Sequence, residues 1–281
     1  MTATRNTSVP FNEKLRTAQR TNNSLLCIGL DIDAASVPAS LRGADDPQFA
    51  FNRAIIEATA DLVCAYKLNI SFYESAGETG WSTVHNTLSV IPDHIITIGD
   101  GKRGDIANSS ERQAHLFCSD WQFDASTVNP YMGTDSVSPF LENPAQCAFV
   151  LALTSNPGAK DFQYLNVNGK PLYEHVVARA KKWNTKKNVG LVVGATRPRE
   201  LAHIRDLVPT MPLLIPGIGA QKGNLEQTVR YGCDRHGELA VINVGRAIIN
   251  ASRETDFAEK ARAAAISFRD QMNRFREKHF M

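Results

Sequence analysis

Three charged residues within six positions are the best candidates for chemistry in this sequence: Asp100, Lys102 and Asp105, in the segment IGDGKRGD. Because side chains alternate along a strand, Asp100 and Lys102 are expected to point to the same side of a sheet. Lys67, in the apolar run LVCAYKLNI, is expected to face the same place from a neighbouring strand. Such an array holds ionised groups in fixed positions, and each close pair contributes about 4 kcal/mol at ~4 Å and an effective dielectric of ~20, before desolvation is subtracted.

A structural role is the main alternative for this cluster. An Asp-x-Lys pair alone is more often a structural ion pair than a catalytic one, because such pairs also perturb pKa values without doing chemistry. The ends of several apolar runs carry polar residues at once, among them Asp31, Gln221 and Arg246. Because buried charge is costly, this convergence favours a functional site.

A second signal points to phosphate and is independent of the charged cluster. Gly217 and Gly219 end one apolar run in IPGIGAQ, and Gly245 with Arg246 ends the next in NVGRAI. Glycine frees backbone N–H groups to approach an anion, and arginine offers a planar fork for phosphate oxygens. The alternative is that these glycines only form tight turns. Two such signals in succession, one with arginine, favour a ligand that carries a phosphate.

Ser155 opens the turn Ser-Asn-Pro-Gly after another apolar run. Its hydroxyl could satisfy its own backbone, as turn serines often do, or it could bind the polar edge of a ligand. The residues alone leave both possibilities open.

The elements that must position these residues follow one repeating pattern. Apolar, β-branched runs alternate with segments of helical spacing, and both faces of each run are largely apolar, as in parallel strands. We expect an α/β protein with a single (β/α)₈ barrel domain over residues 1–281, which fits better than a doubly wound sheet. Residues 1–24 would form an N-terminal helical extension and 253–281 the closing C-terminal helix. The eight runs are 25–32, 62–70, 94–102, 125–131, 147–156, 188–196, 212–220 and 239–248.

Composition excludes several classes of protein. The 281 residues include 43% apolar side chains, and 31 basic against 29 acidic residues give a net charge of +2, so a nucleic-acid-coating surface is not expected. No apolar run is long enough for a membrane helix, and the opening MTATRNTSVP has no apolar core of a secretory signal. The five cysteines form no C-x-x-C pair and the seven histidines no metal-ligand spacing. We therefore expect a cytoplasmic protein with reduced cysteines and no metal site.

With these residues in place, the chain resembles orotidine 5'-monophosphate decarboxylases, most closely the longer bacterial (type 2) branch. A lysine at position 67 distinguishes it from metal-dependent relatives with the same Asp-x-Lys-x-x-Asp core, which carry an acidic ligand there. The resemblance implies decarboxylation of orotidine 5'-monophosphate to uridine 5'-monophosphate (UMP) and CO₂, the last step of de novo pyrimidine synthesis, without a cofactor. The motifs that carry it, between about residues 25 and 250, are AYKLNISFYE, DGKRGDIANS, VNPYMG, LTSNPG, VVGAT, LIPGIGAQ and NVGRAI.

The resemblance also implies roles for the charged residues. Lys102 would deliver a proton to C6 of the pyrimidine, and Asp100 would lie against the departing carboxylate. Lys67 and Asp31 would hold ribose hydroxyls. Asp105 would open the helix after the third strand and point away from its own pocket. In the family this residue reaches into the partner's site, together with residues matched here by Ile106 and Ser109, which implies a homodimer.

The remaining implied contacts concern the pyrimidine edge and the phosphate. Ser155 would bind the pyrimidine edge, and Gln221 both pyrimidine and phosphate. Gly245 and Arg246 would bind the phosphate, while the segment from Pro216 to Gln221 would begin a loop that closes over it. The family usually has glycine at the position of Lys222. If that position requires a positive φ, lysine there would cost about 1 kcal/mol.

Two other functions compete with this one. A class I aldolase would use Lys67 or Lys102 to form a Schiff base with a sugar phosphate. Carboxylate neighbours argue against it, because they hold a lysine protonated and a Schiff-base amine must be neutral. A non-catalytic nucleotide-binding barrel would bind UMP without turnover, and the presence of both Lys102 and Asp100 argues against that.

Overall fold

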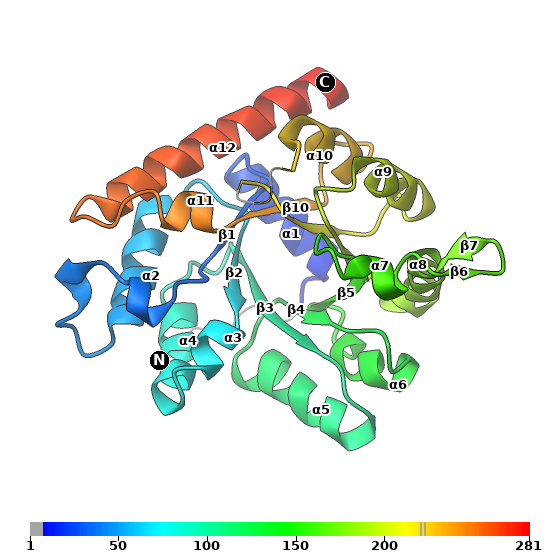
Figure 1. Ribbon diagram of the computed structural model, residues 1–281, viewed down its shortest axis with the longest axis horizontal. Coiled ribbons are helices and arrows are strands. Elements are labelled where there is room, and N and C mark those ends of the chain that lie inside the picture. Colours follow the sequence, from blue (N-terminus) through cyan, green and yellow to red (C-terminus); the bar gives the residue numbers. More distant parts are fainter. Residues whose placement is uncertain (1–7, 220, 222) are drawn as a thin grey trace.

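Parallel strands close into a barrel in the computed structural model, which describes residues 8–219, 221 and 223–281. The order around the barrel is β1, β10, β9, β8, β5, β4, β3 and β2 (Figure 1). Seven of the eight predicted apolar runs contain one of these strands, and β3 extends one residue beyond the eighth, the run 94–102; this confirms the (β/α)₈ barrel. The strands are β1 (Leu26–Gly29), β2 (Ala65–Asn69), β3 (Ile96–Arg103), β4 (Ala125–Val128), β5 (Cys147–Leu153), β8 (Val189–Val193), β9 (Leu213–Pro216) and β10 (Ala240–Val244).

Helices surround the barrel, and their ends follow local sequence signals (Figure 1). The Asp46 side chain caps α2 by accepting a hydrogen bond from the Phe49 N–H, and Pro47 occupies the first turn. Asn224 caps α10 in the same way by accepting from the Gln227 N–H. The helices are α1 (Phe11–Thr21), α2 (Pro47–Thr59), α3 (Ser71–Glu74), α4 (Glu78–Ser89), α5 (Ala107–His115), α6 (Thr134–Val137), α7 (Ala159–Phe162), α8 (Leu172–Trp183), α9 (Pro198–Leu207), α10 (Leu225–Gly232), α11 (Arg246–Ile249) and α12 (Phe257–Phe280).

Helix α1 closes the end of the barrel at which the strands begin. Phe11 and Leu15 are fully buried and belong to the same apolar cluster as the inward-facing strand residues. Gln19 donates from Nε2 to the Ala240 carbonyl (2.8 Å) and accepts from the Leu239 N–H (3.0 Å). Both of these residues lie at the start of β10, so α1 leaves the opposite end of the barrel open.

The last helix, α12, lies along the outside of the barrel (Figure 1). Phe257 at its start stacks on Phe51 of α2, with ring centroids 5.2 Å apart. Ala261, Ala265 and Met272 continue the buried face of the helix. Within the described residues, no helix combines the length and the apolar character that crossing a membrane requires.

One element was not predicted from the sequence. Within the connection between β5 and α8, β6 (Asn166–Val167) pairs antiparallel with β7 (Lys170–Pro171). Asn168 and Gly169 join them with positive φ values of 51° and 82°. An Asn-Gly pair is a strong hairpin signal, because both residues tolerate the left-handed conformation that a two-residue turn needs. The sequence therefore contained the signal for this hairpin.

Candidate active site

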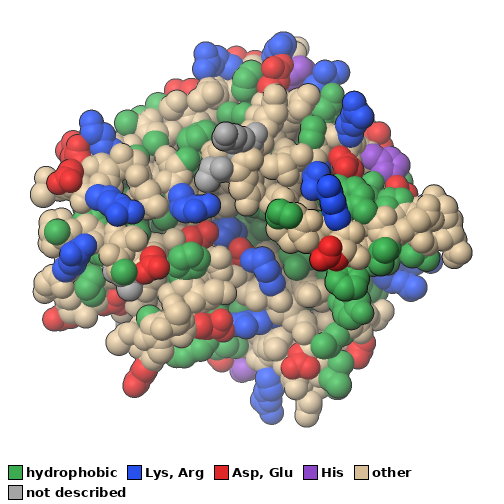
Figure 2. Space-filling model, in the orientation of Figure 1, with side chains coloured by type: hydrophobic (Ala, Val, Ile, Leu, Met, Phe, Trp, Pro, Cys, Tyr) green, Lys and Arg blue, Asp and Glu red, His purple; other side chains and the backbone are tan. Residues whose placement is uncertain are grey.

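A cavity of about 530 Å³ opens at the end of the barrel where the strands finish. Figure 2 shows a hollow in this face, with acidic and basic side chains gathered around it. Polar residues at strand ends thus converge as the barrel prediction requires. Nine predicted site residues line the cavity: Asp31, Lys67, Asp100, Lys102, Ser155, Pro216, Gln221, Gly245 and Arg246.

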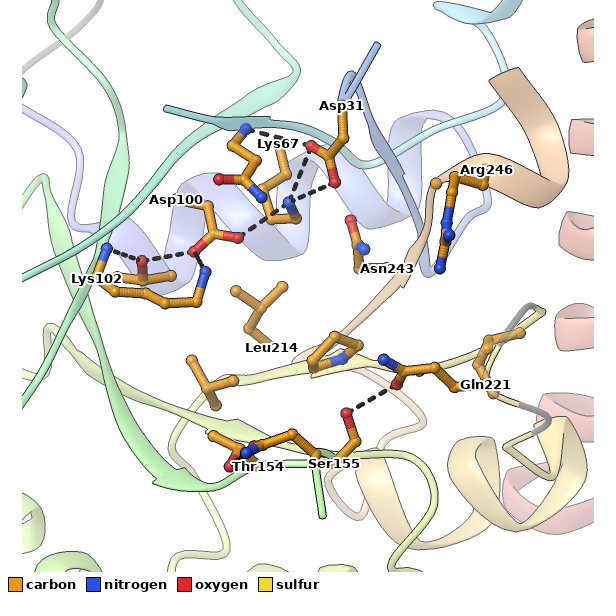
Figure 3. Close-up of a pocket in the computed structure, with 18 of the residues that line it drawn as sticks. Asp31, Lys67, Asp100, Lys102, Thr154, Ser155, Leu214, Gln221, Asn243 and Arg246 are labelled. Carbon is orange, nitrogen blue, oxygen red and sulfur yellow. Dashed lines mark hydrogen bonds and ion pairs between the residues drawn. The ribbon is translucent and has the colours of Figure 1, made fainter. Parts of the chain in front are cut away.

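Four of these residues form a chain of alternating charge across the floor of the cavity (Figure 3). Lys67 Nζ lies 3.3 Å from Asp31 Oδ1 and 3.1 Å from Asp100 Oδ2. Asp100 Oδ1 in turn lies 2.8 Å from Lys102 Nζ. The register between β2 and β3 explains the contact, because Asn69, two residues beyond Lys67, pairs with Asp100. The predicted array is therefore present in the structure.

Burial and the neighbouring charges set the protonation states of Lys67 and Asp100. Burial alone would lower the pKa of Lys67, but the charges of Asp31 and Asp100 outweigh it and raise that pKa above its usual value. Burial alone would raise the pKa of Asp100, but Lys67, Lys102 and the Thr127 hydroxyl lower it well below its usual range. Lys67 and Asp100 are thus both held ionised at neutral pH.

The loops after β9 and β10 form the other side of the cavity. Gly217 and Gly219 have φ values of 112° and 86°, a region that side chains disfavour. Ser155 Oγ donates a hydrogen bond of 2.8 Å to Gln221 Oε1, so the two predicted recognition residues contact each other (Figure 3). Exposed Arg246 begins the short helix α11 directly after Gly245. Lys222, where the sequence departs from the family pattern, lies outside the described residues.

Three predicted residues do not line the cavity of their own chain. Asp105, Ile106 and Ser109 lie around the start of α5, and the Ile106 side chain is 58% exposed. The prediction that Asp105 opens this helix is wrong by two residues, because α5 begins at Ala107. Asp105 Oδ1 instead accepts from the Ile106 N–H (2.7 Å), a local bond that holds the turn before the helix.

Two polar residues of the cavity, Thr127 of β4 and Asn243 of β10, were not predicted from the sequence. Thr127 Oγ1 donates to Asp100 Oδ1 (2.8 Å). Asn243 Oδ1 accepts a weak hydrogen bond from the buried Cys27 thiol, with 3.6 Å between sulfur and oxygen. Each of the two lies one position before its strand ends, and the available signal was a polar residue among apolar ones within a predicted run.

The cavity also has an apolar part, formed by Leu151, Val192 and Leu214 on β5, β8 and β9. These side chains line the same cavity as the four charged residues Asp31, Lys67, Asp100 and Lys102. Among the described residues, no group of three or more His, Cys, Asp or Glu side chains is arranged to hold a metal ion. The site thus combines a charged wall, an apolar wall and a glycine-arginine edge.

Sequence comparison identifies relatives over most of the chain. Residues 24–262 match the orotidine 5'-phosphate decarboxylase / HUMPS family. A protein of Ralstonia pickettii named orotidine 5'-phosphate decarboxylase is 47% identical over 272 residues, which cover 95% of this chain and 99% of the relative. A protein of the same name from Flavobacterium johnsoniae is 49% identical over 253 residues, covering 89% and 92% of the two chains.

Solved structures give the same result. The OMP decarboxylase of Leishmania donovani superposes with a TM-score of 0.82 at 35% identity, covering 96% of this chain and 99% of that one. The UMP synthase of the same organism superposes with a TM-score of 0.86 at 36% identity, covering 96% of this chain and 57% of that one. With a family match over most of its length and relatives close to half identical, this chain belongs to the orotidine 5'-phosphate decarboxylase / HUMPS family.

Proposed function

We propose that this protein decarboxylates orotidine 5'-monophosphate to UMP and CO₂, the last step of de novo pyrimidine synthesis. The observation that carries the proposal is the row of ion pairs of alternating charge from Asp31 to Lys102. This row lines the same cavity as Gly217, Gly245 and Arg246, which form the glycine-arginine edge. A nucleotide monophosphate matches both sides, with its phosphate at the edge and its reacting ring at the charged wall. The relatives named above carry this activity in their names.

The reacting bond would lie beside Asp100 and Lys102. The bond between C6 and the carboxylate breaks, the electron pair stays on C6, and CO₂ leaves. The Lys102 ammonium then gives its proton to C6, which yields UMP and a neutral lysine that solvent reprotonates. Asp100 is held ionised, so it would repel the substrate carboxylate in the ground state. A preorganised ammonium is worth most where negative charge develops, so we propose no metal or organic cofactor for this step.

Binding of the rest of the nucleotide would fall to the other cavity residues. Lys67 and Asp31 would hold ribose hydroxyls, and Ser155 the pyrimidine edge. Arg246 and the backbone at Gly245 would bind the phosphate with Gln221, and the segment that begins at Pro216 would close over it. Binding energy from the non-reacting phosphate would then assemble the site and exclude water.

We also propose that the protein is a homodimer in which Asp105, Ile106 and Ser109 complete the partner's site. Their position supports this, because they lie near the barrel mouth but do not line their own cavity. Exposed Ile106 is an apolar side chain that a partner would cover. The five unpaired cysteines support a reducing compartment, for which we propose the cytoplasm.

The class I aldolase is not favoured. A Schiff base needs a neutral amine, and the carboxylates of Asp31 and Asp100 raise the pKa of Lys67. Lys102 lies against the same Asp100 carboxylate.

The direct test is the change in ultraviolet absorbance when the protein meets orotidine 5'-monophosphate with excess chelator, beside Lys102→Ala. Turnover that resists chelator and is lost in the variant supports the proposal. If the wild-type protein shows no turnover, the proposal fails, and borohydride trapping with sugar phosphates would test the aldolase.

A further inference from the structure

The backbone around Lys102 is irregular, although the residue lies within β3. Between Gly99 and Arg103, β3 advances four residues, while its partner β4 advances only two, from Ser126 to Val128. Lys102 itself has a φ of 46°, in the left-handed region that non-glycine residues rarely adopt. A bulge of this kind re-aims side chains and breaks the ladder of backbone hydrogen bonds. Simple alternation along the strand therefore does not explain where Lys102 points.

Thr127 lies opposite this bulge and replaces the missing backbone partner. Its Oγ1 accepts a hydrogen bond from the Lys102 N–H (2.9 Å) and donates one to Asp100 Oδ1 (2.8 Å). The amide can only donate and the ionised carboxylate can only accept, so the direction of both bonds is set. Asp100 Oδ1 also accepts from Lys102 Nζ (2.8 Å), which closes a ring through the three residues.

We propose that Thr127 is a positioning residue that holds the Lys102 ammonium in place through this ring. Its hydroxyl fixes the left-handed backbone at one end of the lysine and the Asp100 carboxylate at the other. Thr127 is 1% exposed, so water does not easily replace the hydroxyl. The inference rests on the proposed decarboxylation, because it assigns Lys102 the proton transfer.

The test uses Thr127→Val, which keeps the shape and removes the hydroxyl, and Thr127→Ser, which keeps the hydroxyl. Thr97, at the other end of the β3–β4 pair, supplies a matched control, because its Oγ1 also donates to a carboxylate (Asp124, 3.0 Å) and accepts from a backbone N–H (Asp124, 3.2 Å). Thr97→Val thus removes the same kind of buried bridge away from the cavity. Turnover, KM and thermal stability would be measured for all three variants and the wild-type protein.

A positioning role predicts a specific pattern. Loss of hydrogen bonds to a charged group should lower kcat of Thr127→Val about 10- to 100-fold, with KM changed by less than about threefold. Thr127→Ser should stay within about threefold of wild-type kcat, and Thr97→Val should lose stability while keeping kcat within about twofold. Wild-type kcat in Thr127→Val, or an equal loss of kcat in Thr97→Val, would overturn the proposal.

A crystal structure of Thr127→Val separates this inference from the proposed reaction. The expected result is that Lys102 leaves its left-handed backbone or loses its contact with Asp100, while both persist in Thr127→Ser. If Lys102 keeps its backbone and its contact in Thr127→Val, Thr127 does not position it, whatever the turnover. Absence of turnover in the wild-type protein would instead contradict the proposed function, and the structures would still decide the role of Thr127.

Discussion

Lys67 and Asp100 form a buried ion pair, with 3.1 Å between Nζ and Oδ2 and with both side chains almost wholly removed from solvent. The pair couples β2 to β3 at the point where the cavity begins. Lys67 also contacts Asp31, and Asp100 also contacts Lys102, so removing either member of the pair leaves its poorly solvated neighbours with one opposite charge fewer.

The first prediction concerns Lys67→Met, which keeps the length of the side chain and removes its charge. Asp31 would then lose the lysine that lies against it, and Asp100 would keep Lys102 as its cationic partner, so the free energy of unfolding should fall by about 3–5 kcal/mol and turnover should be lost. Denaturant unfolding measures the first effect. Arg262→Met, which breaks the exposed pair with Asp61, is the control and should cost less than about 1 kcal/mol. Equal losses in the two variants would contradict this account.

The second prediction is the pH dependence of stability that arises from Asp100. Its pKa in the folded protein lies below the usual aspartate value of 3.8, so its contribution to stability is present above that value and is lost as the pH falls toward the folded pKa. The difference in unfolding free energy between wild type and Asp100→Asn should be constant near neutral pH and shrink below pH 3.8. A difference that stays constant throughout acid titration would show that Asp100 is not held ionised.

The third prediction tests whether sites are shared between subunits. Lys102→Ala and Asp105→Ala should each be inactive alone. In a mixed dimer, one site has Lys102 from one chain and Asp105 from the other, so it is intact. Unfolding and refolding the two variants together should restore about a quarter of wild-type activity, because half of the dimers are mixed and each has one working site. Failure to restore activity, with dimers present in sedimentation, would show that each site uses its own Asp105.

The fourth prediction concerns phosphate recognition by Arg246. Lysine in its place keeps the charge but loses the planar fork, so Arg246→Lys should lower kcat/KM for orotidine 5'-monophosphate by about 10- to 100-fold. Activity toward orotidine, which lacks the phosphate, should not change. An equal loss with both substrates would place the effect of Arg246 elsewhere.

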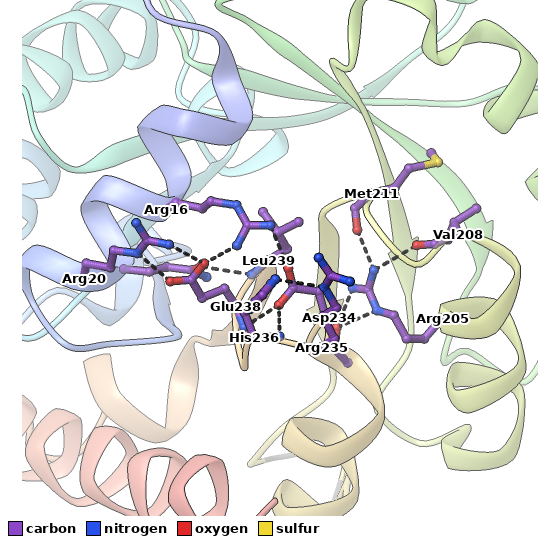
Figure 4. Close-up of polar contacts among 12 residues, drawn as sticks. Arg16, Arg20, Arg205, Val208, Met211, Asp234, Arg235, His236, Glu238 and Leu239 are labelled. Atoms are coloured by element: carbon purple, nitrogen blue, oxygen red, sulfur yellow. Dashed lines mark hydrogen bonds and ion pairs between the residues drawn. The ribbon is translucent and has the colours of Figure 1, made fainter. Parts of the chain in front are cut away.

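The fifth prediction separates stability from activity at the other end of the barrel. Figure 4 shows ion pairs that hold α1 there: Arg16 Nη2 lies 2.7 Å from Asp234 Oδ2, and Arg20 Nε lies 2.6 Å from Glu238 Oε1. Leu15 on the same helix is fully buried in the barrel interior. Leu15→Ala should therefore cost about 2–5 kcal/mol of stability. Its kcat should remain at the wild-type value, because the cavity opens at the opposite end, and a large loss of kcat would contradict this separation.

Much of the site could be predicted because it depends on local patterns. Apolar runs place Lys67 and Asp100 within neighbouring parallel strands, and a barrel brings the carboxyl-terminal parts of its strands together whatever the details of packing. The glycines near Arg246 indicate an anion edge for a similar reason, since their backbone freedom is a property of the residue itself.

Only the tertiary structure decided how Lys102 reaches Asp100. The sequence suggested simple alternation, whereas the strand bulges and Lys102 takes a left-handed backbone held by Thr127. A bulge depends on the register between two strands far apart in the chain, and neither strand alone specifies that register. The residue types and their order along the chain therefore determined the barrel and most of its charged site, while packing between β3 and β4 determined the direction of the lysine proposed to do the chemistry.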